Sequence, residues 1–318
     1  MRYLINIMLA LALMLVAGNI SAQDSLQILL QKAGKGRADK DLNKARVNYL
    51  SVLELEPGNF TALSNLGVVY STTGDSVKAK EYFFKAYAID PDNSDLCNNL
   101  GAIFSNEGDR DKAIQYFERA LSLDTANAVH ITQLGQEYAR AGQISKALPY
   151  LYRAKSLSLD NPIVLFWLGN SYASSKNLDS ANHYYDLAVD KGGTAKDLLY
   201  FRGRIKQRLG LIEEAEKSFQ AAIKVDSQYA ECLQSLAMIY LNTERYVQAI
   251  DHFRRVTTID SAYYPGWIGL GASLSLNGLT PQADTVLDRL FAVDSAMGFQ
   301  MLNIISTNYS KQKKTGPK

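Results

Sequence analysis

Apolar residues recur along this chain with the spacing of helices, and the whole pattern repeats every 34 residues. In the segment 60–93 they stand three or four positions apart, as at Leu63, Leu66 and Tyr70, which places them on one face of a helix. The same 34-residue offset holds without insertion from Leu26 to Met297. It divides the chain into eight consecutive units: 26–59, 60–93, 94–127, 128–161, 162–195, 196–229, 230–263 and 264–297.

Three places within each unit keep their chemistry. The twentieth place is alanine in all eight units, and the twenty-fourth is bulky, as at Phe83 or Phe219. A glycine inside a helix costs about 0.5–1 kcal/mol relative to alanine, so its recurrence at the eighth place needs a reason. We expect two short antiparallel helices per unit, which the small residues allow to touch while the bulky residue fills the space beside them. The glycines of the eighth place are Gly67, Gly101, Gly135, Gly169, Gly203 and Gly271.

This pattern resembles the tetratricopeptide repeat, W-x2-L-G-x2-Y…A-x3-F…P. The segment 60–93 carries it as Leu63, Leu66, Gly67, Tyr70, Ala79, Phe83, Ala86 and Pro91. The resemblance covers residues 26–297 and implies an all-α fold, a right-handed superhelical solenoid of antiparallel helix pairs. A C-terminal cap helix over 298–310 and a disordered basic tail over 311–318 are expected to follow. The unit 162–195 ends in "DKGGTAK", where two glycines replace the usual tight turn, and this segment is predicted to be the softest joint of the array.

The N-terminus has the pattern of a secretory signal peptide. One cation, Arg2, precedes an apolar run that ends in small residues, so cleavage is expected after Ala22. The alternative is an uncleaved anchor, but the run is shorter than the roughly 20 residues that a spanning helix needs. We therefore expect residues 1–22 to be removed from an exported chain, periplasmic or secreted, that no longer spans a membrane. Its two cysteines, Cys97 and Cys232, are predicted to be buried free thiols.

Charge and motif content exclude several classes of function. Lys and Arg number 34 against 32 Asp and Glu, a net charge of +2, whereas proteins that grip nucleic acid usually carry a clear basic excess. No nucleophilic triad, phosphate loop or paired-carboxylate motif stands outside the repeat pattern, and the three histidines share no spacing. We therefore expect no enzymatic activity, no cofactor and no metal, and a protein or peptide as the partner.

Arrays of this family bind their partners on surfaces, and the resemblance implies that the first helix of each unit lines a concave face. The second, fifth, ninth and twelfth places of each unit would be exposed there. In the middle of the array these places combine aromatic, amide and cationic groups, which are common anchors of binding sites. The candidate ligand-binding residues are Phe166, Asn170, Tyr200, Arg204, Gln207, Gln234 and Met238.

Two interpretations of this set remain open. In the first, an extended peptide segment binds there and Arg204 pairs with one of its acidic groups. In the second, Phe166 and Tyr200 only pack against neighbouring units.

The segment "FRGRIKQRLG" at 201–210 could be mistaken for a four-cation site. On a helix, Arg202 and Lys206 share one face while Arg204 and Arg208 share another. Glu213, Glu214 and Glu216 in the following helix are expected partners for some of these cations. We therefore predict internal ion pairs for Arg202 and Lys206, and only Arg204 remains as a groove cation.

The leading hypothesis is an exported scaffold that binds a partner protein segment on the concave face of a repeat solenoid. One alternative is a cell-wall or carbohydrate-binding module that uses Phe166 and Tyr200 as stacking platforms. Another is a structural subunit of an envelope assembly, with no ligand in the groove.

Overall fold

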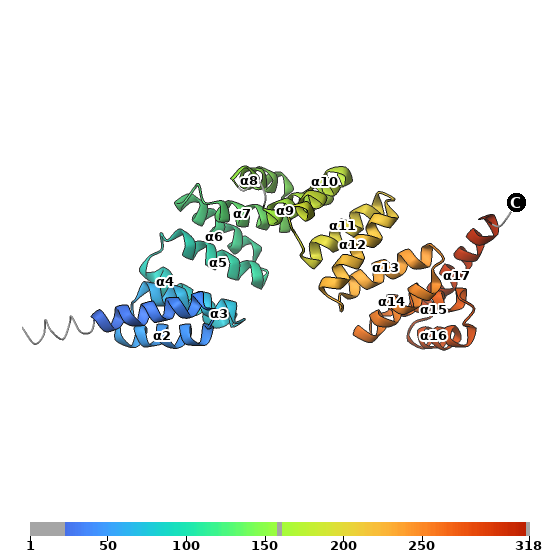
Figure 1. The fold of residues 1–318 in the computed structure, drawn as a ribbon, viewed down its shortest axis with the longest axis horizontal. Coiled ribbons are helices and arrows are strands. Elements are labelled where there is room, and N and C mark those ends of the chain that lie inside the picture. Colours follow the sequence, from blue (N-terminus) through green and yellow to red (C-terminus); the bar gives the residue numbers. More distant parts are fainter. Residues whose placement is uncertain (1–22, 158–160, 316–318) are drawn as a thin grey trace, which may run out of the picture. The chain divides into compact units, whose positions relative to one another are not determined.

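The computed structural model describes residues 23–157 and 161–315. The predicted signal peptide, residues 1–22, lies outside the described residues. Helices joined by short turns make up the described part of the chain, which contains no β-strand (Figure 1). The chain divides into two compact units, unit 1 before Ser158 and unit 2 from Ser158 onward.

Unit 1 begins with a helix over residues 23–38 and continues with helices in pairs. These further helices are α2 (Leu42–Leu55), α3 (Phe60–Thr72), α4 (Ser76–Ile89), α5 (Ser94–Glu107), α6 (Arg110–Leu123), α7 (Ala128–Arg140) and α8 (Ile144–Leu157).

Unit 2 continues the same alternation and ends with a single longer helix. Its helices are α9 (Pro162–Ser174), α10 (Leu178–Asp190), α11 (Lys196–Arg208), α12 (Ile212–Val225), α13 (Ala230–Asn242), α14 (Tyr246–Ile259), α15 (Tyr264–Leu276), α16 (Thr280–Val293) and α17 (Ser295–Thr315).

The repeating glycines bring the two helices of a pair into contact, as the sequence predicts. A Cβ atom added at Gly203 on α11 would lie 2.7 Å from a ring carbon of Phe219 on α12, and Phe219 is fully buried. Gly169 and Tyr185 form the same arrangement in α9 and α10. The ring of the twenty-fourth place therefore lies directly on the glycine of the eighth, and the buried alanines of the twentieth place complete the contact.

The fifteenth place of each 34-residue repeat ends the first helix with a backbone in the left-handed region. Five repeats have glycine there, including Gly210 at φ 79°, whereas Lys40, Lys176 and Glu244 adopt φ values of 60–62°. A side chain in this region costs about 1–2 kcal/mol. The three non-glycine residues show that packing of the helix pairs is strong enough to impose this turn.

The last helix differs from its predicted bounds. A cap helix was expected over 298–310 and a disordered tail from 311, whereas α17 spans Ser295–Thr315. It begins earlier because the Asp294 carboxylate accepts a hydrogen bond of 2.8 Å from the backbone N–H of Ala296. It extends further because Lys and Gln, which dominate 311–314, favour helices.

Burial accounts for the two cysteines. Cys97 and Cys232 are free and buried, which confirms the prediction, and they lie in different units. Loss of hydration raises the pKa of the Cys232 thiol to about 12 and also raises the pKa of Cys97. Both are therefore unreactive core residues. Among the described helices, none has the length and apolar content needed to cross a bilayer.

Candidate functional site

All seven candidate residues lie in unit 2, on three successive first helices. Phe166 and Asn170 belong to α9, Tyr200, Arg204 and Gln207 to α11, and Gln234 and Met238 to α13. We call the surface formed by these seven residues the first-helix face of unit 2. Its members differ strongly in exposure and in their internal contacts, so they contribute to it in different ways.

The two aromatic candidates pack extensively within unit 2. Tyr200 is only 9% exposed, with ring centroids 5.9 Å from Phe219 and 5.2 Å from Tyr229. Phe166 is half-buried, and its ring centroid lies 6.1 Å from that of Phe201 on α11. Tyr200 therefore supports the surface from beneath, whereas Phe166 joins α9 to α11 and remains partly accessible.

An apolar hollow of about 370 Å³ opens beside Phe166, between the N-terminal ends of α9 and α11. Ile163, at its edge, is 55% exposed although it is a large apolar residue. The lining residues are Asn161, Pro162, Ile163, Phe166, Gly193, Thr194, Ala195, Asp197 and Leu198. Most of these are apolar or present methyl groups, so the hollow is suited to an apolar side chain.

The double-glycine turn shapes the hollow. A Cβ atom at Gly193 would lie 2.6 Å from the Leu198 side chain, 2.7 Å from the Ala188 carbonyl oxygen and 3.1 Å from the Pro162 Cβ. The turn is therefore closely packed, which does not support the interpretation of this segment as the softest joint. Instead, Gly193 lets the chain press against the wall of the hollow where any larger residue would intrude.

Asn170 is fixed by a neighbour from the second helix of its own pair. The Tyr185 hydroxyl donates a hydrogen bond of 2.6 Å to the Asn170 Oδ1 atom. Burial raises the pKa of Tyr185, so this hydroxyl stays protonated and remains a donor. The Asn170 carbonyl oxygen is thus occupied, while its NH2 group has no acceptor among the described residues and can donate to a ligand.

The cations of α11 divide as their positions on the helix predict. Arg202 donates to Asp186 at 2.6 Å, and Lys206 pairs with Asp186 at 3.1 Å and with Glu214 at 2.6 Å. Lys206 is 2% exposed, so these contacts belong to the interior. The internal pairing of both cations is confirmed, and Glu214 is a partner of Lys206 as predicted. The partner of Arg202 is Asp186 of the preceding helix α10, not one of the predicted glutamates.

Arg204 points to a different environment. Its guanidinium lies 5.8 Å from the centroid of the Tyr200 ring, and the residue is exposed. No carboxylate of the described residues pairs with it. The aromatic ring holds the guanidinium in place and leaves its donors available.

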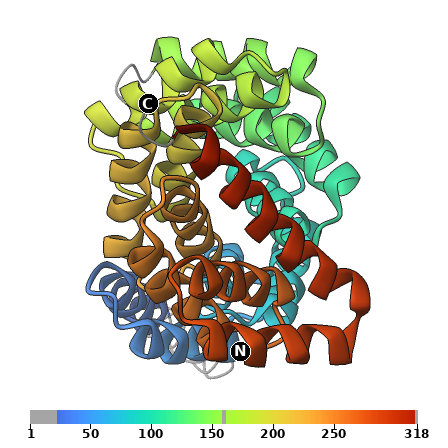
Figure 2. The same cartoon turned by 90° about the vertical axis from the view of Figure 1, so that its right-hand side faces the viewer.

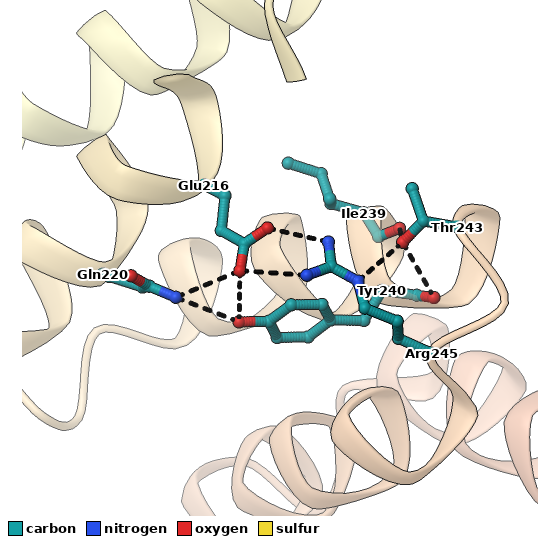
Figure 3. A network of polar contacts seen from close by, with 6 residues as sticks. All are labelled: Glu216, Gln220, Ile239, Tyr240, Thr243 and Arg245. Carbon is teal, nitrogen blue, oxygen red and sulfur yellow. Dashed lines mark hydrogen bonds and ion pairs between the residues drawn. The ribbon is translucent and has the colours of Figure 1, made fainter. Parts of the chain in front are cut away.

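Glu216, by contrast, forms an ion pair with a cation outside α11. It accepts hydrogen bonds of 2.7 and 3.1 Å from Arg245, and its Oε1 also accepts from Tyr240 and Gln220 (Figure 3). The sequence places Glu216 near the α11 cations, so this pairing corrects that part of the prediction. The network ties α12 to α13 and α14, and its charges are satisfied within the protein.

Two tyrosines outside the candidate set connect the first helices. The Tyr229 hydroxyl donates to Asp197 on α11 at 2.9 Å, and the Tyr263 hydroxyl donates to Gln234 on α13. Both tyrosines occupy the last place of a 34-residue repeat. In the first four repeats this place holds asparagine, which caps the next helix, as Asn59, Asn93, Asn127 and Asn161 do. The fifth repeat has Ala195 there. The change from asparagine to tyrosine at a fixed place is the signal that could have identified them.

The remaining candidates are less accessible than the sequence suggests. Gln207 is half-buried, and Met238 is half-buried against the core of unit 2. The Gln234 carbonyl oxygen is already occupied by Tyr263. The accessible chemistry of the first-helix face is therefore concentrated in the hollow beside Phe166, the Asn170 amide and the Arg204 guanidinium.

Comparison with known proteins agrees with this architecture. Family models described as "Tetratricopeptide repeat" match residues 60–93, 94–125, 132–196 and 201–264. Tetratricopeptide repeat protein 7B of Homo sapiens is 29% identical over 82 residues, which are 26% of this chain and 10% of that protein. The chain therefore spans about a tenth of the length of this curated relative.

Solved structures share the fold at low sequence identity. A tetratricopeptide repeat protein from Parabacteroides merdae has a TM-score of 0.61 and 14% identity, covering 79% of this chain and 99% of that one. The APC/C hetero-tetramer Cut9–Hcn1 has a TM-score of 0.67 and 19% identity, covering 76% and 48%. PilW, a type IV pilus biogenesis factor, has a TM-score of 0.59 and 23% identity, covering 66% and 97%. At these identities the likeness concerns the fold alone.

Proposed function

Because the chain belongs to the tetratricopeptide repeat family, whose stacked repeats serve as surfaces for binding other proteins, we propose that it is an exported, non-enzymatic scaffold. In this proposal an extended segment of a partner protein binds on the first-helix face of unit 2. Export rests on the leader-like pattern of residues 1–22. The binding site rests on the apolar hollow beside Phe166, between α9 and α11, and on the cation of Arg204 on α11.

The hollow supplies most of the binding free energy in this proposal. Its volume of about 370 Å³ lies within the range of roughly 300–1,000 Å³ that is typical of ligand pockets. Burying one large apolar side chain contributes about 1.5–3 kcal/mol. An apolar residue of the partner therefore acts as the anchor, covering Phe166 and the exposed side of Ile163.

Arg204 sets the position and direction of the bound segment. Because its guanidinium is exposed, a single ion pair there adds only about 0–1 kcal/mol. Between Leu198 in the hollow and Arg204, α11 rises about 9 Å. An extended chain covers that distance in about three residues. The expected ligand thus has an apolar residue and an acidic residue about three positions apart.

The carbohydrate-binding alternative receives less support from the geometry. Stacking on a sugar ring requires an exposed aromatic face, whereas Tyr200 is 9% exposed and covered by Phe219 and Tyr229. Of the two residues proposed as stacking platforms, only Phe166 remains partly accessible. A peptide anchor in the hollow can contact Phe166 without needing a second platform.

An array of synthetic peptides probed with the purified protein tests this function. Binding is expected to be strongest where an apolar and an acidic residue stand about three positions apart. Ile163→Glu should weaken it at least about tenfold, because a carboxylate at the hollow must lose hydration. Arg204→Glu should change the preference from an acidic to a basic residue.

Two substitutions on second helices are matched controls. Val247 on α14 is 70% exposed, and Lys217 on α12 is exposed and lies outside the first-helix face. Val247→Glu and Lys217→Glu introduce the same charges and should leave binding unchanged. Equal losses in the controls, or binding without dependence on spacing, would show that the first-helix face is not the site.

A further inference from the structure

The last helix, α17, occupies the position of the first helix of a ninth repeat. Counting on from residue 298 places Met301 at the fourth place and Ile304 at the seventh, where most of the other repeats carry large apolar residues. Met301 is 1% exposed, and its side chain lies against Gly271 of α15. The helices on which α17 packs are α15 and α16. In Figure 2, where α17 is red, no helix of unit 2 lies in front of it.

The open side of α17 is not shaped to receive a second helix of its own repeat. The eighth place, which is glycine in six repeats and alanine in two, is Ile305 here. In four of the other pairs an aromatic ring rests directly on this place, as Phe219 does on Gly203, and in α7–α8 the Leu151 side chain does. A branched side chain at Ile305 excludes such a ring, so a different kind of neighbour is required.

This side of α17 carries an exposed apolar surface. Phe299 is 63% exposed and Leu302, one turn further along, is 40% exposed. Phe291 of α16, 36% exposed, meets the Phe299 ring edge to face at 5.4 Å between centroids. We call these three residues the α17 patch. Exposed apolar side chains that gather in one place mark interaction sites on protein surfaces, so the patch indicates a contact.

The patch is also uncharged along the helix. Residues 295–310 contain no Asp, Glu, Lys, Arg or His, although 21% of the chain is charged. Their outward polar groups are uncharged, at Gln300, Asn303 and Ser306. Depletion of charge is characteristic of the core of protein interfaces.

We propose that the α17 patch is the contact between two copies of this chain, with the two α17 helices packed against each other about a two-fold axis. In a two-fold contact each surface meets its own copy, so it must be complementary to itself. A patch with charges of one sign would repel its copy, whereas the apolar and uncharged α17 patch meets this requirement. The contact is independent of the first-helix binding site.

Sedimentation equilibrium of the purified protein tests this contact. The unaltered protein is expected to be a dimer at about 10 μM. Phe299→Glu combined with Leu302→Glu should raise the dissociation constant at least about 100-fold, because it places like charges on both sides of the contact. Val77→Glu combined with Val247→Glu, at sites 80% and 70% exposed on second helices, is the matched control and should leave the dimer intact.

Mixing two single variants separates a contact from a folding defect. Phe299→Glu and Phe299→Lys proteins should each be monomeric with unchanged helix content by circular dichroism. Together they should form a one-to-one heterodimer, because opposite charges then face each other. An unaltered protein that remains monomeric at about 100 μM, or a dimer that persists in the Glu variants, would overturn the proposal.

Discussion

Replacing Gly203 by alanine should destabilise the protein by about 1–3 kcal/mol, the range found when a well-packed core is overfilled. This sign is opposite to the usual effect, since alanine in a helix is favoured over glycine by about 0.5–1 kcal/mol. The added Cβ would lie 2.7 Å from a ring carbon of Phe219, and the fully buried ring has no free space to move into. Urea unfolding of the two proteins measures the difference.

Gly34 is the matched control for this prediction. It lies in the helix over residues 23–38, and a Cβ added there would meet no atom within 4 Å. Gly34→Ala should therefore stabilise the protein. Combining Gly203→Ala with Phe219→Leu should recover part of the loss, because the smaller side chain makes room for the methyl group. Stabilisation by both alanine substitutions would show that close helix contact is not what requires the glycine.

Removing both carboxylates around Lys206, by Asp186→Ala and Glu214→Ala, should cost about 3–5 kcal/mol, the typical result of leaving a buried charge without its partners. The Lys206 side chain is 3% exposed and its ammonium contacts both carboxylates. No other acceptor contacts this ammonium among the described residues. The free energy of unfolding, from urea titration, gives the magnitude.

A third substitution tests the cause of that loss. Adding Lys206→Met removes the buried charge and keeps most of the side-chain volume, so stability should return to within about 1–2 kcal/mol of the original protein. Lys217→Met, on the exposed surface of α12, is the control and should restore nothing. If the double alanine variant is as stable as the unaltered protein, Lys206 does not depend on these pairs.

Much of the fold follows from the period of the sequence. A residue that recurs every 34 positions meets an equivalent neighbour in most repeats, so the contact between the eighth and twenty-fourth places can be inferred without a structure. Gly271 is an exception, since it meets Val286 and Met301. The helical positions of Arg202 and Lys206 likewise predict their separation from Arg204. These predictions succeed because they depend on spacing within one helix or one helix pair.

The candidate site is less predictable because the exposure of its residues depends on side chains from neighbouring repeats and turns. A place in the repeat indicates which face of a helix carries Tyr200, but the burial of its ring depends on Tyr229 in the following turn. The hollow beside Phe166 depends on the close packing of Gly193, a position outside the shared pattern. The division of the chain before Ser158, one repeat earlier than the double glycine, also has no signal in the periodic places.

Site-specific photo-crosslinking tests most directly whether the first-helix face of unit 2 binds a partner. The crosslinking amino acid p-benzoylphenylalanine would replace Ile163, at the edge of the hollow, or Val247 on α14 as a control of similar exposure. Irradiation of cells that produce each protein, followed by mass spectrometry, identifies the crosslinked chains and peptides. We predict adducts with a partner segment that contains an acidic residue near its crosslinked position, formed from position 163 and not from 247. Adducts formed equally from both positions, or from 247 alone, would contradict the account.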